Sequence, residues 1–173
     1  MKKDVKLYNL IFPSYLIMFL APGAAIYTLL GNFIVDWIVL YFISKAIYKS
    51  FIGKFYLKTI WKVWLLGFLS DIIGVIYLLF SADIFFPTYH LHLNDTSFTG
   101  EFARGVSGAV SGSAFVNFWS FLIRFSAVIL AGFFIFVFNY YVSFSKAEMT
   151  KSQKLKSALA YAIITAPYTI LIY

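Results

Sequence analysis

The feature that most constrains this chain is a series of apolar runs separated by short polar segments. Each run is about 20 residues long, which is enough to cross roughly 30 Å of bilayer hydrocarbon as a helix. Lipid offers no partners for backbone polar groups, so a spanning segment of this kind must satisfy them internally. The sequence therefore predicts an all-α, polytopic bundle of transmembrane helices.

Composition excludes a soluble helical globule. Hydrophobic residues make up 62% of the 173 residues, and charged residues make up only 12%. A soluble domain has about 25% charged residues, so this chain has too few polar side chains to cover a water-facing surface. Its length suits one compact unit, and we expect residues 1–173 to form a single transmembrane domain.

The positions of the apolar runs predict about five spans. Gly31 and Asn32 are interpreted as a tight turn between the first two spans, and residues 83–112 as an external loop. Pro22 and Pro167 lie inside the first and fifth runs, where proline is expected to kink or break a helix. The predicted spans cover residues 8–30, 33–48, 63–81, 114–141 and 158–173.

The segment from residue 50 to residue 62 has a different pattern. Lys54, Lys58 and Lys62 recur every four residues, so they share one side of a helix. A short basic amphipathic helix of this kind lies along an anionic cytoplasmic surface. The sequence predicts such an interfacial helix between spans two and three, although these lysines also fit a simple excess of inward-facing charge.

The distribution of basic residues predicts the orientation. Cytoplasmic loops accumulate Lys and Arg, and an inside N-terminus places twelve lysines inside but only Arg104 in an outer loop. We therefore expect a protein of the cytoplasmic (plasma) membrane, with its N-terminus inside and its C-terminus outside. The richness in Phe, Tyr, Ile and Lys is typical of an AT-rich bacterial genome. The inside lysines are Lys2, Lys3, Lys6, Lys45, Lys49, Lys54, Lys58, Lys62, Lys146, Lys151, Lys154 and Lys156.

Three ionisable residues fall inside predicted spans: Asp36, Asp71 and Arg124. Each costs about 2.5–3.5 kcal/mol at a span centre, so each should face the bundle or water and have a partner. Counting helical rise from the inner ends places Asp71 near mid-membrane, and Asp36 and Arg124 at similar heights of about 20 Å. We therefore expect an Asp36–Arg124 ion pair, with Asp71 as a second partner or an independent site.

A small and polar stripe supports this interpretation. In span four, Asn117, Ser120 and Arg124 follow helical steps along one face that continues through alanines. Small and polar residues on a common face are what close helix packing in lipid requires. The charged set is either architecture, locking the helices together, or a site for a substrate, ion or proton. A lone carboxyl such as Asp71 can avoid much of the charging cost by holding a proton.

The predicted external loop has two features that could carry function, a pair of histidines and a glycine-rich stretch. His90 and His92 form an H-x-H pattern, which is weak evidence for a metal site; an ordinary loop is the favoured interpretation. The glycine-rich stretch from Gly100 to Gly112 is predicted to be a flexible outer loop, with a re-entrant segment as the alternative.

The chemical inventory is otherwise thin. Cysteine is absent, which excludes disulfides and thiolate sites. The sequence has no motif for nucleic acid, for phosphate binding or for a hydrolase, so we expect no cofactor and no nucleic-acid partner.

Three functions remain open. The favoured one is a non-enzymatic subunit of a membrane transport, secretion or resistance assembly. The alternative is a small self-sufficient transporter or channel that uses Asp36, Asp71 and Arg124. A membrane enzyme with an outer-face site comes third. The expected partners are the bilayer, including its anionic lipids, and either other membrane subunits or further copies of the chain.

Overall fold

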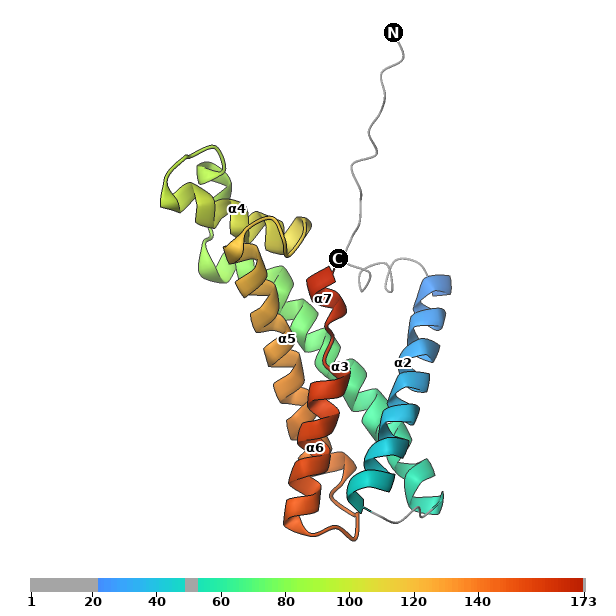
Figure 1. The fold of residues 1–173 in the computed structure, drawn as a ribbon. Helices are drawn as coiled ribbons and strands as arrows, with labels where there is room; N and C mark the ends of the chain where they lie inside the picture. The colour runs from blue at the N-terminus through green and yellow to red at the C-terminus, as the bar shows by residue number, and fades with distance from the viewer. Residues whose placement is uncertain (1–21, 49–52, 173) are drawn as a thin grey trace.

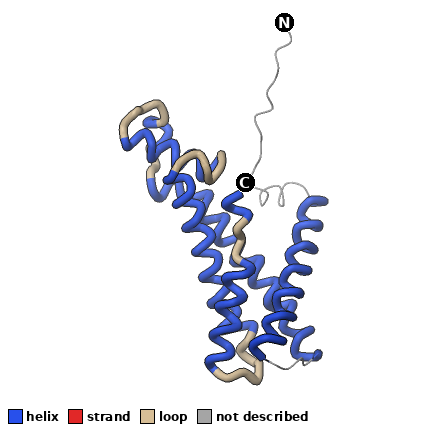
Figure 2. The backbone as a smooth tube through the Cα atoms, viewed as in Figure 1, coloured by secondary structure: helices blue, strands red, loops and turns tan. Residues whose placement is uncertain are grey.

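The computed structural model describes residues 22–48 and 53–172, and these residues form helices without any strand (Figures 1 and 2). In chain order the elements are α2 (Pro22–Ile43), the π-helical turn η1 (Ser44–Tyr48), α3 (Gly53–Phe85), the 3-10 helix η2 (Tyr89–His92), α4 (Phe98–Ser111), α5 (Phe118–Phe138), the π-helical turn η3 (Asn139–Ser143), α6 (Lys151–Thr165) and α7 (Thr169–Ile172).

Four segments of the described chain are long and apolar enough to cross a membrane. They are Leu29–Ile47, Tyr56–Phe85, Phe118–Ser143 and Lys151–Ile172. Large hydrophobic side chains are exposed on the outside of every one of these segments, as in Phe42, Phe80, Phe133 and Ile163. An outward-facing apolar surface of this extent needs a lipid environment. The helix composition thus supports a multi-pass membrane protein.

The predicted turn between spans one and two is wrong. Gly31 and Asn32 lie inside α2, which continues without a break from Pro22 to Ile43. A Gly-Asn pair favours turns in water, but an apolar helix keeps its backbone hydrogen bonds intact, and this overrides the local preference. Residues 8–21 of the predicted first span lie outside the described residues. The described chain contains four candidate spans, and the predicted count of about five is not tested by them.

The basic segment 53–62 does not form a helix of its own. It makes up the first turns of α3, a single helix of 33 residues. Tyr56, Ile60 and Val63 are buried on one side of these turns, so the core-facing side runs straight into the span and nothing interrupts the helix. Lys58 is exposed and Lys62 is half-buried, whereas the side chain of Lys54 lies outside the described residues.

The predicted external loop is largely helical. It contains η2 and α4, and α4 replaces the flexible loop expected for Gly100–Gly112. Ser97 caps the first turn of α4 by accepting from the Gly100 amide, and Asn117 caps α5 by accepting from the Ser120 amide. The α5 helix therefore begins at Phe118, later than the residue 114 predicted.

The C-terminal region is broken where proline predicts a break. The chain leaves helical geometry at Ala166, just before Pro167, and α7 follows as a separate short helix. The helix before the break starts earlier than expected, at Lys151, because Thr150 and Gln153 form a reciprocal capping box.

The helix bundle has two ends that carry different elements (Figure 1). One end carries η2 and α4, with the short α7 nearby, while η1 and the α5–α6 connection lie together at the other end. The Gln153 side chain donates to the Ile47 carbonyl (3.3 Å), which joins the start of α6 to η1. Between the ends, α3 and α5 approach closely, because a side chain at Gly74 would lie 3.0 Å from the Ala131 Cβ.

The capping box gives a first testable expectation. Thr150→Ala should lower the free energy of unfolding by about 1 kcal/mol, because the Gln153 amide loses its acceptor at the exposed start of α6. Thr150→Ser keeps the hydroxyl and is the matched control. Thermal unfolding in mild detergent measures the difference, and equal stability of the two variants would contradict the role of the cap.

Candidate functional site

The polar residues inside the bundle form two groups rather than one. The first group surrounds Arg124 and belongs to the end of the bundle that carries α4. The second group surrounds Asp36 and Asp71 and lies farther from that end.

Arg124 is 2% exposed and binds backbone carbonyls. Its Nε donates to Ala109 O (3.0 Å), and its Nη2 donates to Gly112 O (2.8 Å) and Gly108 O (3.4 Å). Ala109 lies in the last turn of α4 and Gly112 is its C-cap residue, so these carbonyls lie at the end where helix carbonyls lack partners within the helix. The Gly108 carbonyl also accepts from the Gly112 amide. A cation at this position also complements the negative end of the helix dipole. Arg124 therefore caps α4.

The same guanidinium reaches the C-terminal segment. One terminal nitrogen of Arg124 donates to the Ile170 carbonyl in α7 (2.9 Å), and Ile170 is itself buried. A planar guanidinium with several fixed donors suits this role, because one residue can bind carbonyls from two helices at once. Arg124 thus connects α5, α4 and α7.

Asn117 and Ser120 extend this contact between α4 and α5. The Asn117 amide donates to the Glu101 carbonyl (2.8 Å), and the Ser120 hydroxyl donates to the Ser113 carbonyl (2.6 Å). Ser120 is fully buried. The polar stripe predicted from helical spacing is therefore placed at a helix contact, where its partners are backbone atoms.

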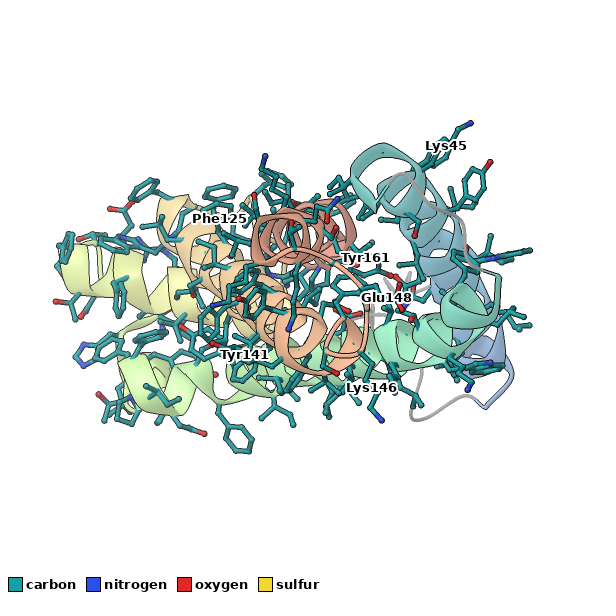
Figure 3. The ribbon with its side chains drawn as sticks, turned by 90° about the horizontal axis from the view of Figure 1, so that it is seen from below. Lys45, Phe125, Tyr141, Lys146, Glu148 and Tyr161 are labelled. Atoms are coloured by element: carbon teal, nitrogen blue, oxygen red, sulfur yellow. The ribbon has the colours of Figure 1, made fainter. Side chains whose placement is uncertain are left out.

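Asp36, Asp71 and Tyr161 come from three helices and form the second group. The Asp36 carboxyl on α2 lies against α3, with Oδ2 3.6 Å from where a Gly67 side chain would begin. Asp71 is one helical turn from Gly67 and interacts electrostatically with Asp36. Tyr161 on α6 is fully buried, and its hydroxyl faces Asp36. Figure 3 shows Tyr161 among the side chains between α6 and the α2–α3 pair.

Two polar atoms of this second group have no hydrogen-bond partner within the described part of the chain. They are Oδ1 of Asp71 and the hydroxyl of Tyr161, and both are buried. The Tyr161 hydroxyl interacts with Asp36 without reaching the geometry of a good hydrogen bond. Buried polar atoms are normally paired, and among the described residues Asn139 Oδ1, Ser143 Oγ and Ser157 Oγ also lack a partner.

The predicted ion pair between Asp36 and Arg124 is not formed. Among the described residues the ion pair within 4 Å is His92–Asp95. Gly74 on α3 is level with Ala131 on α5. Gly67, beside Asp36, is seven residues farther from the α4 end than this level. Arg124 is seven residues nearer to the α4 end than the same level. Fourteen residues of rise separate the two charges by roughly 20 Å.

The error has a physical cause. The heights of Asp36 and Arg124 were counted from two different inner helix ends, which were taken to be level. The close contact between Gly74 and Ala131 fixes the true register of α3 against α5. That register depends on small side chains meeting in three dimensions, which spacing along one helix does not specify.

The two histidines have separate roles at the α4 end. His92 Nδ1 lies 3.1 Å from an Asp95 carboxylate oxygen, and its ring stacks on Phe86 (5.3 Å between centroids). His90 is exposed and meets the edge of Tyr89. In the described ranges, three or more potential metal ligands do not gather at any point. The histidines therefore contribute to the packing of η2.

Sequence reasoning found the two carboxyls but missed Tyr161. A tyrosine in an apolar run has no signal of its own, since aromatic residues are common throughout this chain. Its one distinguishing feature is position, because Ser157, Tyr161 and Ala158 share the buried side of α6.

Comparison with models of protein families, with curated proteins and with solved structures finds no match for this chain. The residues and their geometry therefore carry the functional argument.

Proposed function

We propose that this chain is a non-enzymatic subunit of a membrane transport, secretion or resistance assembly. The single observation that carries the proposal is the thinness of the bundle. In the four candidate spans only 28–33% of the residues are buried inside the chain. A bundle this thin presents most of its surface to lipid or to neighbouring helices, and encloses little volume of its own.

The helix contacts support the same conclusion. The α3 and α5 helices meet at Gly74, where a side chain would lie 3.1 Å from the Ala127 carbonyl. Backbones this close leave no path for a solute between the two helices. A permeation path for anything larger than a proton would need walls from partner helices, which are other subunits or further copies of this chain.

The location and orientation are part of the proposal. Lys45, Lys146 and Lys151 belong to the end that carries η1 and the α5–α6 connection, and Arg104 belongs to the opposite end. Figure 3, seen from the first of these ends, shows Lys45 pointing away from the helices. We propose that this basic end faces the cytoplasm and contacts anionic lipids, and that the C-terminus lies outside.

The proposal is tested on the full chain purified in mild detergent. Native mass spectrometry should detect a complex with other membrane subunits or with further copies. Vesicles that contain the isolated chain should show no more solute flux than empty vesicles. A strictly monomeric chain in detergent and in native membranes would contradict the proposal.

A second candidate is a small self-sufficient transporter or channel, favoured by the buried carboxyls Asp36 and Asp71. Ionisable residues inside a membrane bundle mark ion and proton pathways. The same vesicle experiment separates the two candidates, because a self-sufficient transporter would catalyse flux as an isolated chain. Arg124 is not part of the site in this second candidate function, because its guanidinium binds carbonyls at the end of α4.

A further inference from the structure

We propose that Asp36, Asp71 and Tyr161 form a proton-binding site inside the bundle. In this site the two carboxyls hold protons at neutral pH, and one proton is released to water when the pH rises. The inference rests on the membrane location within the proposed function and names the ligand that the site would take. It stands on three observations: two carboxyls that interact electrostatically, no cation beside them among the described residues, and a buried hydroxyl turned toward Asp36.

The first observation is the approach of two acidic side chains on separate helices. Asp36 Oδ2 lies against α3 at Gly67, 3.6 Å from where a Cβ at that position would be, which is van der Waals contact distance. Asp71 follows Gly67 by one turn on the same face of α3, and its carboxyl interacts electrostatically with that of Asp36. Two neighbouring carboxyls cannot both ionise cheaply, because the second negative charge is repelled by the first.

The second observation is the composition of the surroundings. Within the described ranges, the other titratable groups that interact with the site are Tyr161 from α6 and Tyr56 from α3, whose hydroxyl donates to the Trp37 carbonyl (2.6 Å). Arg124, the one cation of α5, lies roughly 20 Å away by helical rise. Lys62 is nine residues from Asp71, or about 13 Å.

An uncompensated pair of carboxylates in this environment would be unstable. Moving one carboxylate into an apolar interior costs several kcal/mol even after relaxation, and such groups commonly remain protonated instead. A divalent cation such as Ca²⁺ or Mg²⁺ fits the pair poorly, since it requires six or more oxygen ligands or retained waters. Protons neutralise the pair with no further ligands.

The third observation is the Tyr161 hydroxyl. It is fully buried, faces Asp36, and makes no hydrogen bond of good geometry within the described residues. When Asp36 releases its proton to water, the O–H bond of its carboxyl breaks and a carboxylate remains. The Tyr161 hydroxyl can then donate to that carboxylate while keeping its own proton. Tyr161 is thus a positioning residue that stabilises the deprotonated state.

The test measures protonation directly and needs neither flux nor a partner. The full chain is placed in vesicles of zwitterionic lipid, and infrared spectra are recorded as the pH is raised. We expect a carbonyl band from protonated carboxyl at neutral pH. Carbon-13 aspartate should shift this band, which assigns it to aspartate in the unaltered protein. Asp36→Asn and Asp71→Asn should each reduce it, whereas the exposed control Asp83→Asn should leave it unchanged.

Tyr161→Phe supplies a readout that a merely structural role would not move. Loss of the hydroxyl should shift the midpoint of the band to higher pH by about one unit, because the carboxylate loses a donor. Tyr141→Phe, at an exposed tyrosine, is the matched control and should not shift it.

Three results would overturn the proton site: no aspartate band at neutral pH, a band unaffected by both asparagine variants, or loss of the band when sodium replaces choline at fixed pH. The last result would identify sodium as the ligand. Failure of the proposed function is a different result, since a chain that proves monomeric can still show the band.

Discussion

Replacing Arg124 by leucine is expected to be the most damaging single change in the described chain, lowering the free energy of unfolding by about 3–5 kcal/mol. The guanidinium donates to carbonyls of α4 at 3.0 and 2.8 Å and to Ile170 of α7 at 2.9 Å. Leucine has no donor, so these carbonyls lose their partner in a buried place. Thermal unfolding in mild detergent measures the loss.

Arg104→Leu is the matched control for this prediction. Arg104 also donates to two carbonyls, those of Leu93 and Asp95, but at an exposed position where water can replace it. Its loss should cost about 1 kcal/mol or less. Arg124→Lys should fall between the two leucine variants, because an ammonium keeps the charge but not the forked donors. An effect of Arg124→Leu no larger than that of Arg104→Leu would show that Arg124 does not hold α4 and α7.

The sequence predicts on which face of its helix Arg124 lies, but it does not predict what Arg124 binds. Its spacing from Asn117 and Ser120 places all three on one face of α5, and the structure puts that face against α4. The same helical spacing does not identify the binding partner of Arg124. Opposite charge suggested Asp36, but a buried guanidinium is equally satisfied by the free carbonyls of a helix end. Such carbonyls belong to every helix and have no residue signature.

Local propensity failed in the apolar part of the chain. Gly31-Asn32 looks like a turn and lies within α2, while the lysines of segment 53–62 look interfacial and lie on α3. In both places the continuous run of apolar residues decided the outcome, since an unbroken helix satisfies the backbone where lipid cannot. The break at Pro167 was predictable because proline removes a donor whatever the surroundings.

The carboxyl site was predictable only in part. Asp36 and Asp71 stand out in any apolar run, because a charge there is costly and needs a reason. That they lie beside each other depends on how α2 meets α3 at Gly67. A glycine admits close approach but does not name the helix that approaches. Tyr161 was missed because a buried tyrosine resembles the other aromatic residues of the core.

The glycine-rich stretch 100–112 was predicted to be flexible and forms α4 instead. Glycine weakens a helix in water, so a segment with several glycines favours a loop interpretation. In the structure Gly105 and Gly108 lie against the residues that begin α5, and Gly100, Ala103, Val106 and Ala109 are also buried. Glycine therefore serves contact rather than freedom here. The helical spacing of the small residues was the signal that could have revealed it.

Gly105→Ala tests this reading of α4 and should lower the free energy of unfolding by about 2–3 kcal/mol. A Cβ at this position would clash with the Cβ of Trp119 and lie 2.9 Å from Oδ1 of Asn117, the capping atom of α5. Both neighbours sit on the first turn of a helix and cannot turn aside, so α4 must move away from α5. Amide hydrogen exchange should therefore speed up across α4 while α3 stays protected.

Gly31→Ala is the matched control, because it makes the same chemical change where there is room. No atom of the described residues lies within 4 Å of a Cβ at Gly31, which is exposed in the interior of α2. There alanine should raise the free energy of unfolding by about 0.5–1 kcal/mol, since it is the better helix former. Opposite signs for the two variants are the expected result. If Gly105→Ala stabilised the protein instead, α4 would not pack tightly on α5, and its glycines would serve backbone flexibility rather than close packing.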